Sequence, residues 1–154
     1  MQQLTISKIK DGTVIDHINS GKALMVLRIL GISSGTKEPV SMAMNVPSKK
    51  MGKKDIVKVE GKFINEDELN RIALIAPGAT INLIEDYEIK KKFRVVLPGF
   101  VEGIIRCPNP YCISNARGEP ISSKFHVSKN GEEAIVARCH YCGKKLRNVE
   151  DFIA

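Results

Sequence analysis

The sequence predicts an α+β protein of two domains, over residues 1–96 and 101–154, joined by the segment VVLPGFV at 95–101. Two observations predict this division. In the first part, strand-like and helix-like spacings of apolar residues follow one another in the order β-α-β-β-α-β. In the second part, two short clusters between positions 107 and 142 contain all four cysteines of the chain.

The N-terminal part is expected to begin with strand residues and then a helix. LTISKIK and TVIDHI are rich in β-branched residues and are separated by Asp11-Gly12, which favours one strand or two paired strands. NSGKALMVLRILG predicts a helix with Asn19 or Ser20 as N-cap and Gly31 at its end. Its apolar face would consist of Ala23, Leu24, Leu27 and Leu30.

The following segments complete the domain. VSMAMNV and DIVKVEG alternate as strands, and INEDELNRIALIAPGA is the clearest helix of the chain. Asn65 is its predicted N-cap, Glu68 completes a capping box, and Pro77-Gly78 ends it. TINLIEDYEI is expected to be one final strand. The βαββαβ order is that of a ferredoxin-like fold, with two helices on one face of an antiparallel sheet. The other face needs a further cover, often a second subunit.

The four cysteines are spaced as C-x4-C, a gap of twenty-six residues, and C-x2-C. The N-terminus lacks a secretory pattern, and no apolar run approaches the about 20 residues that span a membrane. We therefore expect a cytoplasmic protein, in which disulfides are rare and metal ligation is the better interpretation. Four thiolates suit a structural zinc ion and leave no position open for a catalytic water. Disulfides and a rubredoxin-type iron site remain alternatives.

The segment between the two cysteine pairs predicts a β-hairpin. SSKFHV and EEAIVARC flank Asn130-Gly131, a strong turn signal, and VEGIIRC supplies another short strand. Together these elements predict a small all-β zinc ribbon, similar in type to rubredoxin. Because roughly 50 residues bury little apolar surface, we expect the metal to contribute most of the folding energy.

The positive net charge of the chain is compatible with binding of a polyanion, but it does not establish such binding. The net charge is +7 and the pI is about 9.3. The first hundred residues carry 16 Lys+Arg against 11 Asp+Glu, concentrated in 49–58 and 90–94. These lysines indicate either a solvated surface or a binding site. A zinc-ribbon nucleic-acid-binding protein is the main alternative function, although aromatic residues make up 5% and Trp is absent.

No pattern of catalytic residues is present in the sequence. Asp16-His17 is the only acid-histidine pair, and adjacent residues of a strand point to opposite faces, which argues against a catalytic dyad. The pair is still compatible with a binding role at the end of a strand.

Several segments occur in one order over nearly the whole chain: GTVIDHI, NVPSKKMGKKDIVKVE, IALIAPGATIN, CPNPYCIS and CHYC. In this order they resemble the regulatory chain of aspartate carbamoyltransferase. The resemblance implies a chain without catalytic activity, which forms homodimers and in which three such dimers bridge two catalytic trimers in pyrimidine biosynthesis. It also implies that ATP and CTP compete for one site on the first domain, with UTP reinforcing CTP in some members.

The resemblance further implies roles for individual residues. Asp16 would hold the ribose hydroxyls, and Lys58 would contact the ribose and the base edge. Lys92 would neutralise phosphates, with His17 nearby. The base pocket would be formed by Ile9, Asn82, Ile84, Tyr87 and Ile89.

In the second domain, the resemblance implies one zinc ion per chain and a contact with the catalytic chain. The implied ligands are Cys107, Cys112, Cys139 and Cys142. Asn109 and Lys144 would face the catalytic chain. Ser7-Lys8 and Pro110-Tyr111 depart from the family pattern, in the phosphate region and in the first zinc loop respectively.

Overall fold

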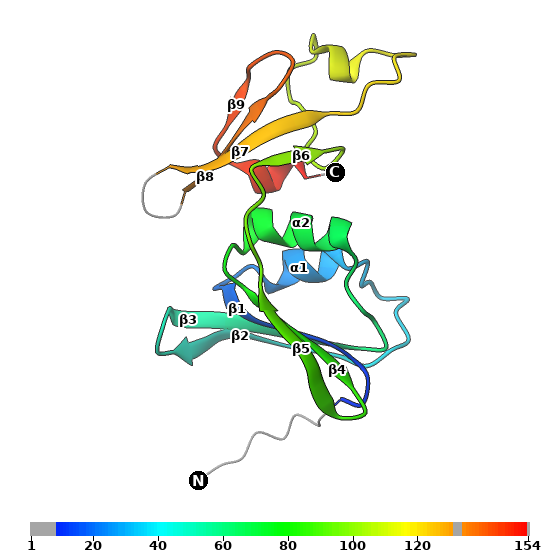
Figure 1. Cartoon of the computed structure of the whole chain (residues 1–154), viewed down its shortest axis with the longest axis vertical. Helices are drawn as coiled ribbons and strands as arrows, with labels where there is room; N and C mark the ends of the chain where they lie inside the picture. Colours follow the sequence, from blue (N-terminus) through cyan, green and yellow to red (C-terminus); the bar gives the residue numbers. More distant parts are fainter. Residues whose placement is uncertain (1–8, 131–133, 154) are drawn as a thin grey trace.

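A computed structural model describes residues 9–130 and 134–153, and Figure 1 shows two domains stacked along the long axis of the molecule. The N-terminal domain contains a five-stranded antiparallel sheet and two helices. Both helices lie on the side of the sheet that faces the C-terminal domain. The elements of this domain are β1 Gly12–Asn19, α1 Ala23–Ile29, β2 Val40–Ser48, β3 Gly52–Glu60, α2 Glu66–Ile75, β4 Thr80–Glu85 and β5 Glu88–Arg94.

The strand order β2-β3-β1-β4-β5 confirms the predicted fold class and adds one strand. Its first four strands have the ferredoxin-like order, with β1 paired antiparallel to both β3 and β4. Gly12, at the start of β1, has φ +149°, and a Cβ there would lie 2.3 Å from the Val59 carbonyl oxygen. Only glycine therefore allows β1 to approach β3 so closely at this point.

The prediction of one strand over TINLIEDYEI was wrong, because the chain turns back at Asp86-Tyr87 to form the hairpin β4–β5. Both turn residues have positive φ, 52° and 67°, as a two-residue type I′ turn requires. The turn is held from outside: the Tyr87 N–H donates to the Lys10 carbonyl, and the Asp86 N–H donates to the Asp11 carboxylate. The predicted strand at LTISKIK lies mostly outside the described residues, and Ile9 to Asp11 form no strand.

The predicted start of α1 was also wrong. Its N-cap is Lys22, and no side chain of its own segment caps it. Instead, the fully buried Asp55 of β3 accepts N–H bonds from Gly21 and Ala23, at 2.8 and 2.9 Å. The buried side of this helix consists of Ala23, Val26 and Leu30, whereas Leu24 is 59% exposed. Gly31 follows the helix with φ +75°, as expected.

The structure confirms α2 in detail. Asn65 accepts the N–H of Glu68, and the Glu68 side chain accepts the N–H of Asn65, which completes the capping box. Ile72 and Ile75 enter the N-terminal core, while Leu74 packs into the core of the C-terminal domain. The helix therefore belongs to one domain and covers the other.

The C-terminal domain is a four-stranded antiparallel sheet in the order β6-β7-β8-β9. Its elements are β6 Phe100–Glu102, the 3-10 helix η1 Ile113–Asn115, β7 Lys124–Asn130, β8 Ala134–Cys139, β9 Lys145–Leu146 and the 3-10 helix η2 Val149–Phe152. The predicted hairpin is confirmed, but Asn130 pairs with Ala134 as a strand residue, so it is not part of the turn. Gly131 lies outside the described residues.

The two domains share a packed boundary. Ile153 contacts both apolar cores and pairs with Ile105 in an isolated bridge, and Val95 is buried in the N-terminal core. The connection between the two sheets, 95–99, is shorter than the predicted linker 95–101, because β6 already begins at Phe100. Among the residues that the structure describes, no helix combines the length and apolarity of a membrane span.

Candidate functional site

The four cysteines converge on one point of the C-terminal domain. Their Sγ atoms all lie within 4.8 Å of one another. Cys107 lies 3.6 Å from Cys142, and Cys112 lies 3.6 Å from Cys139. All four are free thiols, since a disulfide would bring two sulfurs to about 2.05 Å. The disulfide alternative is therefore excluded in this structure.

Hydrogen bonds to backbone carbonyls shape both cysteine loops. In the second loop, the Cys139 N–H donates to the Lys144 carbonyl at 2.9 Å, and the Gly143 N–H donates to the Cys139 carbonyl at 3.0 Å. In the first loop, the Asn115 side chain donates to the carbonyls of Cys107 and Asn109, at 2.9 and 2.7 Å. Asn115 was not predicted as a site residue, and its distance of eight positions from Cys107 gave no signal.

The thiols differ in acidity because they differ in burial and in hydrogen bonds. Burial raises the pKa of Cys107 to about 12 and also raises the pKa of Cys139. For Cys142, burial acts in the same direction but is outweighed. Hydrogen bonds from the Lys144 backbone, the Asn109 side chain and two neighbouring thiols lower its pKa to about 6. One thiolate is thus available at neutral pH before any cation binds.

The arrangement fits a tetrahedral metal ion. With metal–sulfur bonds of ~2.3 Å, the sulfurs of a tetrahedral site lie about 3.8 Å apart. The Cys107–Cys142 and Cys112–Cys139 Sγ–Sγ distances of 3.6 Å are close to that value. Three of the ligands are buried and Cys142 is exposed, so an ion could enter from one side. Four sulfur ligands leave no position for water, which makes the site structural.

Residues predicted to bind nucleotide lie in one row across the N-terminal sheet. Val14 of β1 lies between Lys58 of β3 and Asn82 of β4, and Asn82 pairs in turn with Lys92 of β5. Residues paired in this way share a face of the sheet. The adjacent row is part of the helix-covered core and contains Val57, Ile15, Ile81 and Phe93. The row with the two lysines therefore occupies the helix-free face.

Asp16 lies further along β1 on the same face as Val14, and its neighbour His17 does not lie where the sequence predicted. The expectation that His17 points to the opposite face was wrong, because β1 and β3 shift register between Ile15 and Ile18. His17 has φ 57°, and its Nδ1 lies 3.8 Å from the Asp16 carboxylate and 3.4 Å from the Thr80 hydroxyl. The bulge brings the imidazole beside the carboxylate.

The remaining predicted residues lie at the β4–β5 end of the sheet. Ile84 pairs with Ile89 on the same helix-free face, and Ile89 is 59% exposed. Tyr87 is 61% exposed in the turn, and Ile9 is buried just before the Lys10 carbonyl that receives the Tyr87 N–H. Tyr87 and Ile89 thus add exposed apolar surface to the end of this face, which a ligand or partner could cover.

Two basic residues on this face were not predicted. The Nζ of Lys54 lies 3.0 Å from the Asp16 carboxylate, and Arg94 pairs with Thr80, the partner of Asp16. A cavity of about 320 Å³ adjoins Arg94 and is also lined by His17 and Thr80. Lys54 could have been found from the sequence, since it lies four positions before Lys58 on one strand and hence on the same face.

Comparison with known proteins gives two matches that together span most of the chain. Residues 4–96 match the allosteric domain of the aspartate carbamoyltransferase regulatory chain. Residues 100–151 match the metal binding domain of the same chain.

Individual relatives agree with these matches, and each is named aspartate carbamoyltransferase regulatory chain. The Archaeoglobus fulgidus protein is 64% identical over 154 residues, covering 100% of both chains. The Pyrococcus horikoshii protein is 52% identical over 97% of each chain. The Staphylothermus marinus protein is 50% identical over 98% of this chain and 92% of its own.

Proposed function

The chain belongs to the family of aspartate carbamoyltransferase regulatory chains, and from this premise we propose that it binds CTP and ATP on its helix-free sheet face and bridges catalytic trimers through a zinc domain. Its family membership makes it a non-catalytic subunit with an allosteric and a metal-binding domain, which acts together with a catalytic chain. The observation that carries the nucleotide proposal is the row across the sheet that contains Lys58, Asn82 and Lys92 on one face.

The chemistry of this face suits a nucleoside triphosphate. The Asp16 carboxylate can accept hydrogen bonds from two ribose hydroxyls, and lysine ammonium groups attract phosphate oxygens as point charges. The Asn82 side chain offers both a donor and an acceptor to a base edge. The exposed Tyr87 and Ile89 would cover the base at the β4–β5 end. UTP is a further candidate ligand of this region.

Zinc is the proposed metal, one ion per chain, held by the four cysteine thiolates. All-sulfur tetrahedral ligation is typical of structural zinc. The ion would link the two loops, which no disulfide connects. Iron in the same ligand set would give a coloured protein, so a colourless metal-loaded chain is expected.

The metal-binding domain is the proposed contact with the catalytic chain. Tyr111 is 92% exposed and Ile113 is 47% exposed, and both lie in or next to the first cysteine loop. Contact with a partner would remove this apolar surface from water. Asn109 braces this loop through its backbone and side chain, and the Lys144 side chain is exposed beside the second loop. We place the catalytic chain on this end, with three regulatory dimers joining two trimers in the cytoplasm.

A titration of the zinc-loaded chain with CTP and ATP tests the nucleotide proposal. We expect saturable, mutually competitive binding at near-physiological salt. Asp16→Ala and Lys92→Ala should each raise the dissociation constant by about tenfold or more, since each removes a hydrogen bond in which one or both partners are charged. Isothermal calorimetry measures the constants.

Lys91→Ala is the matched control, because Lys91 pairs with Leu83 one position away and so projects from the other face. It should leave the dissociation constants within about twofold. If Lys91→Ala and Lys92→Ala reduced nucleotide affinity equally, net charge alone would explain the effect. Salt-dependent binding of a short RNA without competitive nucleotide binding would favour the nucleic-acid alternative instead.

A further inference from the structure

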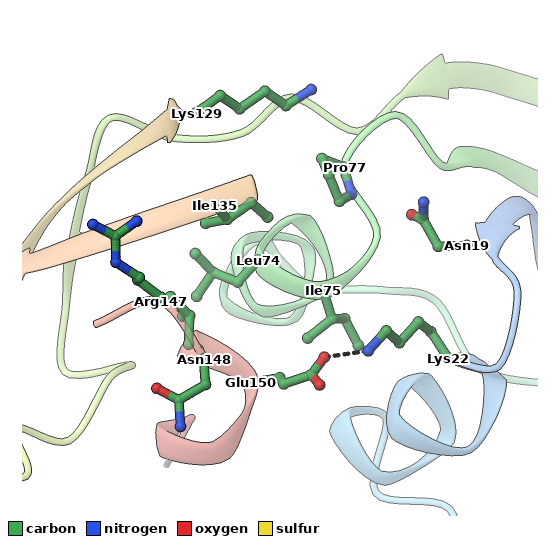
Figure 2. A pocket seen from close by; sticks show the side chains of 11 residues that line it. Asn19, Lys22, Leu74, Ile75, Pro77, Lys129, Ile135, Arg147, Asn148 and Glu150 are labelled. Carbon is green, nitrogen blue, oxygen red and sulfur yellow. Dashed lines mark hydrogen bonds and ion pairs between the residues drawn. The ribbon is translucent and has the colours of Figure 1, made fainter. Parts of the chain in front are cut away.

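An ion pair connects the two domains at the start of α1. The Lys22 ammonium contacts the Glu150 carboxylate of η2, and Figure 2 shows the two side chains meeting between α1 and η2. The side chains are 31% and 35% exposed, so water screens the pair only in part. None of the residues to which the nucleotide proposal assigns a role takes part in this contact.

The backbone of Lys22 is fixed from the sheet beneath it. Its two neighbours, Gly21 and Ala23, donate their N–H groups to one oxygen of Asp55. The other oxygen of Asp55 accepts the N–H of Asn45 on β2, at 2.9 Å. Because Asp55 is fully buried on β3, a shift of β3 at this position must also move the start of α1.

The residue before Asp55 contacts the candidate nucleotide face. Lys54 lies 3.0 Å from the carboxylate of Asp16, on the opposite side of the strand from Asp55. Ribose hydroxyls bound at Asp16 would compete with Lys54 for the carboxylate, and a phosphate group nearby would draw the Lys54 ammonium to a new position. Lys54 and Asp55 are adjacent on β3. Lys54 contacts the candidate nucleotide face, and Asp55 contacts the start of α1.

We infer that β3 transmits nucleotide binding to the start of α1, and that the Lys22–Glu150 ion pair passes it on to the metal-binding domain. The inference rests on the proposed function. A cavity of about 400 Å³ lies beside the pair and is lined by residues of both domains, among them Leu74 and Ile135. Such a contact changes an equilibrium only when it differs between the two arrangements of the domains.

The test uses the reconstituted holoenzyme of regulatory and catalytic chains. The coupling factor is the ratio of the half-saturating aspartate concentrations measured with and without saturating nucleotide. In Lys22→Met and Glu150→Gln we expect this factor to move towards one by about two- to fivefold. The exchange variant Lys22→Glu with Glu150→Lys should recover most of the wild-type value.

Two controls remove similar charges nearby without breaking the pair. Lys129→Met changes a lysine that lines the same cavity, and Asp151→Asn changes the residue next to Glu150. Both should keep the wild-type coupling factor. Nucleotide dissociation constants of the free zinc-loaded chain should stay within about twofold of wild type in every variant, since none of the altered residues lies on the nucleotide face.

The outcomes separate the inference from the proposed function. A wild-type holoenzyme without any nucleotide response overturns the proposed function and the inference with it. A responsive wild type whose Lys22→Met and Glu150→Gln variants respond equally overturns the inference alone. Controls that lose as much coupling as these variants also overturn it, because the effect would then come from net charge. Recovery in the exchange variant supports it.

Discussion

At the scale of single residues, Asp55 has a larger structural role than its place in a lysine-rich segment suggests. It accepts three backbone N–H groups, from Gly21, Ala23 and Asn45. Asn45 has φ 60°, and its own side chain contacts Ser20. One buried carboxylate thus stabilises the start of α1 and the irregular part of β2 together.

We predict that Asp55→Ala lowers the free energy of unfolding by about 3–5 kcal/mol, because it leaves three backbone N–H groups, one in a buried and two in part-buried bonds, without their acceptor. Chemical denaturation of the zinc-loaded chain, followed by circular dichroism, measures the loss. Asp11→Ala is the control, since Asp11 accepts one N–H in an exposed setting and should cost about 1 kcal/mol. Similar losses for both variants would contradict the central role given to Asp55.

Cys142 gives the metal site its expected dependence on pH. Metal ions bind thiolates, so every thiol that is protonated in the free protein must release a proton on binding. Above about pH 6 Cys142 is already ionised, whereas Cys107, with a pKa of about 12, still carries its proton. Below about pH 6 Cys142 is protonated as well. Zinc affinity should therefore fall with decreasing pH, and fall more steeply below pH 6.

Competition with a chelator between pH 5.5 and 8 measures this effect. The slope of log affinity against pH equals the number of protons displaced, so it should increase by about one on passing below pH 6. Cys142→Ser should remove that change of slope together with much of the affinity. A constant slope through pH 6 in the wild type would show that the pKa of Cys142 does not lie near 6.

At the scale of elements, predictions from the sequence were most accurate where an element depends on residues close together in the chain. The capping box of α2 requires only Asn65 and Glu68, three positions apart, and both bonds are present. The β7–β8 hairpin and the two cysteine loops were likewise found from short spacings. In each case the residues that form the element also hold it in place.

The predictions failed where a distant residue decides the local structure. The β4–β5 turn lacks the Gly that usually allows positive φ, and it depends on Lys10 and Asp11, about 75 positions earlier. The start of α1 depends on Asp55 of β3 in the same way. The bulge that places His17 beside Asp16 arises from the pairing of β1 with β3. No pattern within these segments could show the tertiary contacts.

At the scale of the whole molecule, the two domains differ in what stabilises them. The N-terminal domain has an apolar core of its own between sheet and helices, which includes Ile15, Val57, Ile72 and Ile81. In the C-terminal domain, Cys107, Cys112 and Cys139 are themselves part of the buried cluster around Phe125. Three of the four proposed ligands thus belong to the core there, so a metal ion held by the cysteines would also hold this core together.

We therefore predict that metal removal unfolds one domain and leaves the other folded. Chelation should expose amides of β6 to β9 to rapid hydrogen exchange, while those of β1, β3 and β4 keep most of their protection. Leu74 would lose its cover, so the outer side of α2 should show intermediate exchange. The holoenzyme should at the same time release its catalytic trimers, which size-exclusion chromatography detects.

Zinc readdition serves as the control and should restore both the protection pattern and the assembly. Equal loss of protection in both sheets would mean that Leu74 and Ile153 bind the two cores into one cooperative unit. An assembly that survives complete metal removal would contradict the placement of the catalytic chain on the cysteine loops. The exchange pattern and the assembly state thus test separate parts of the structural argument, the first the independence of the cores and the second the site of subunit contact.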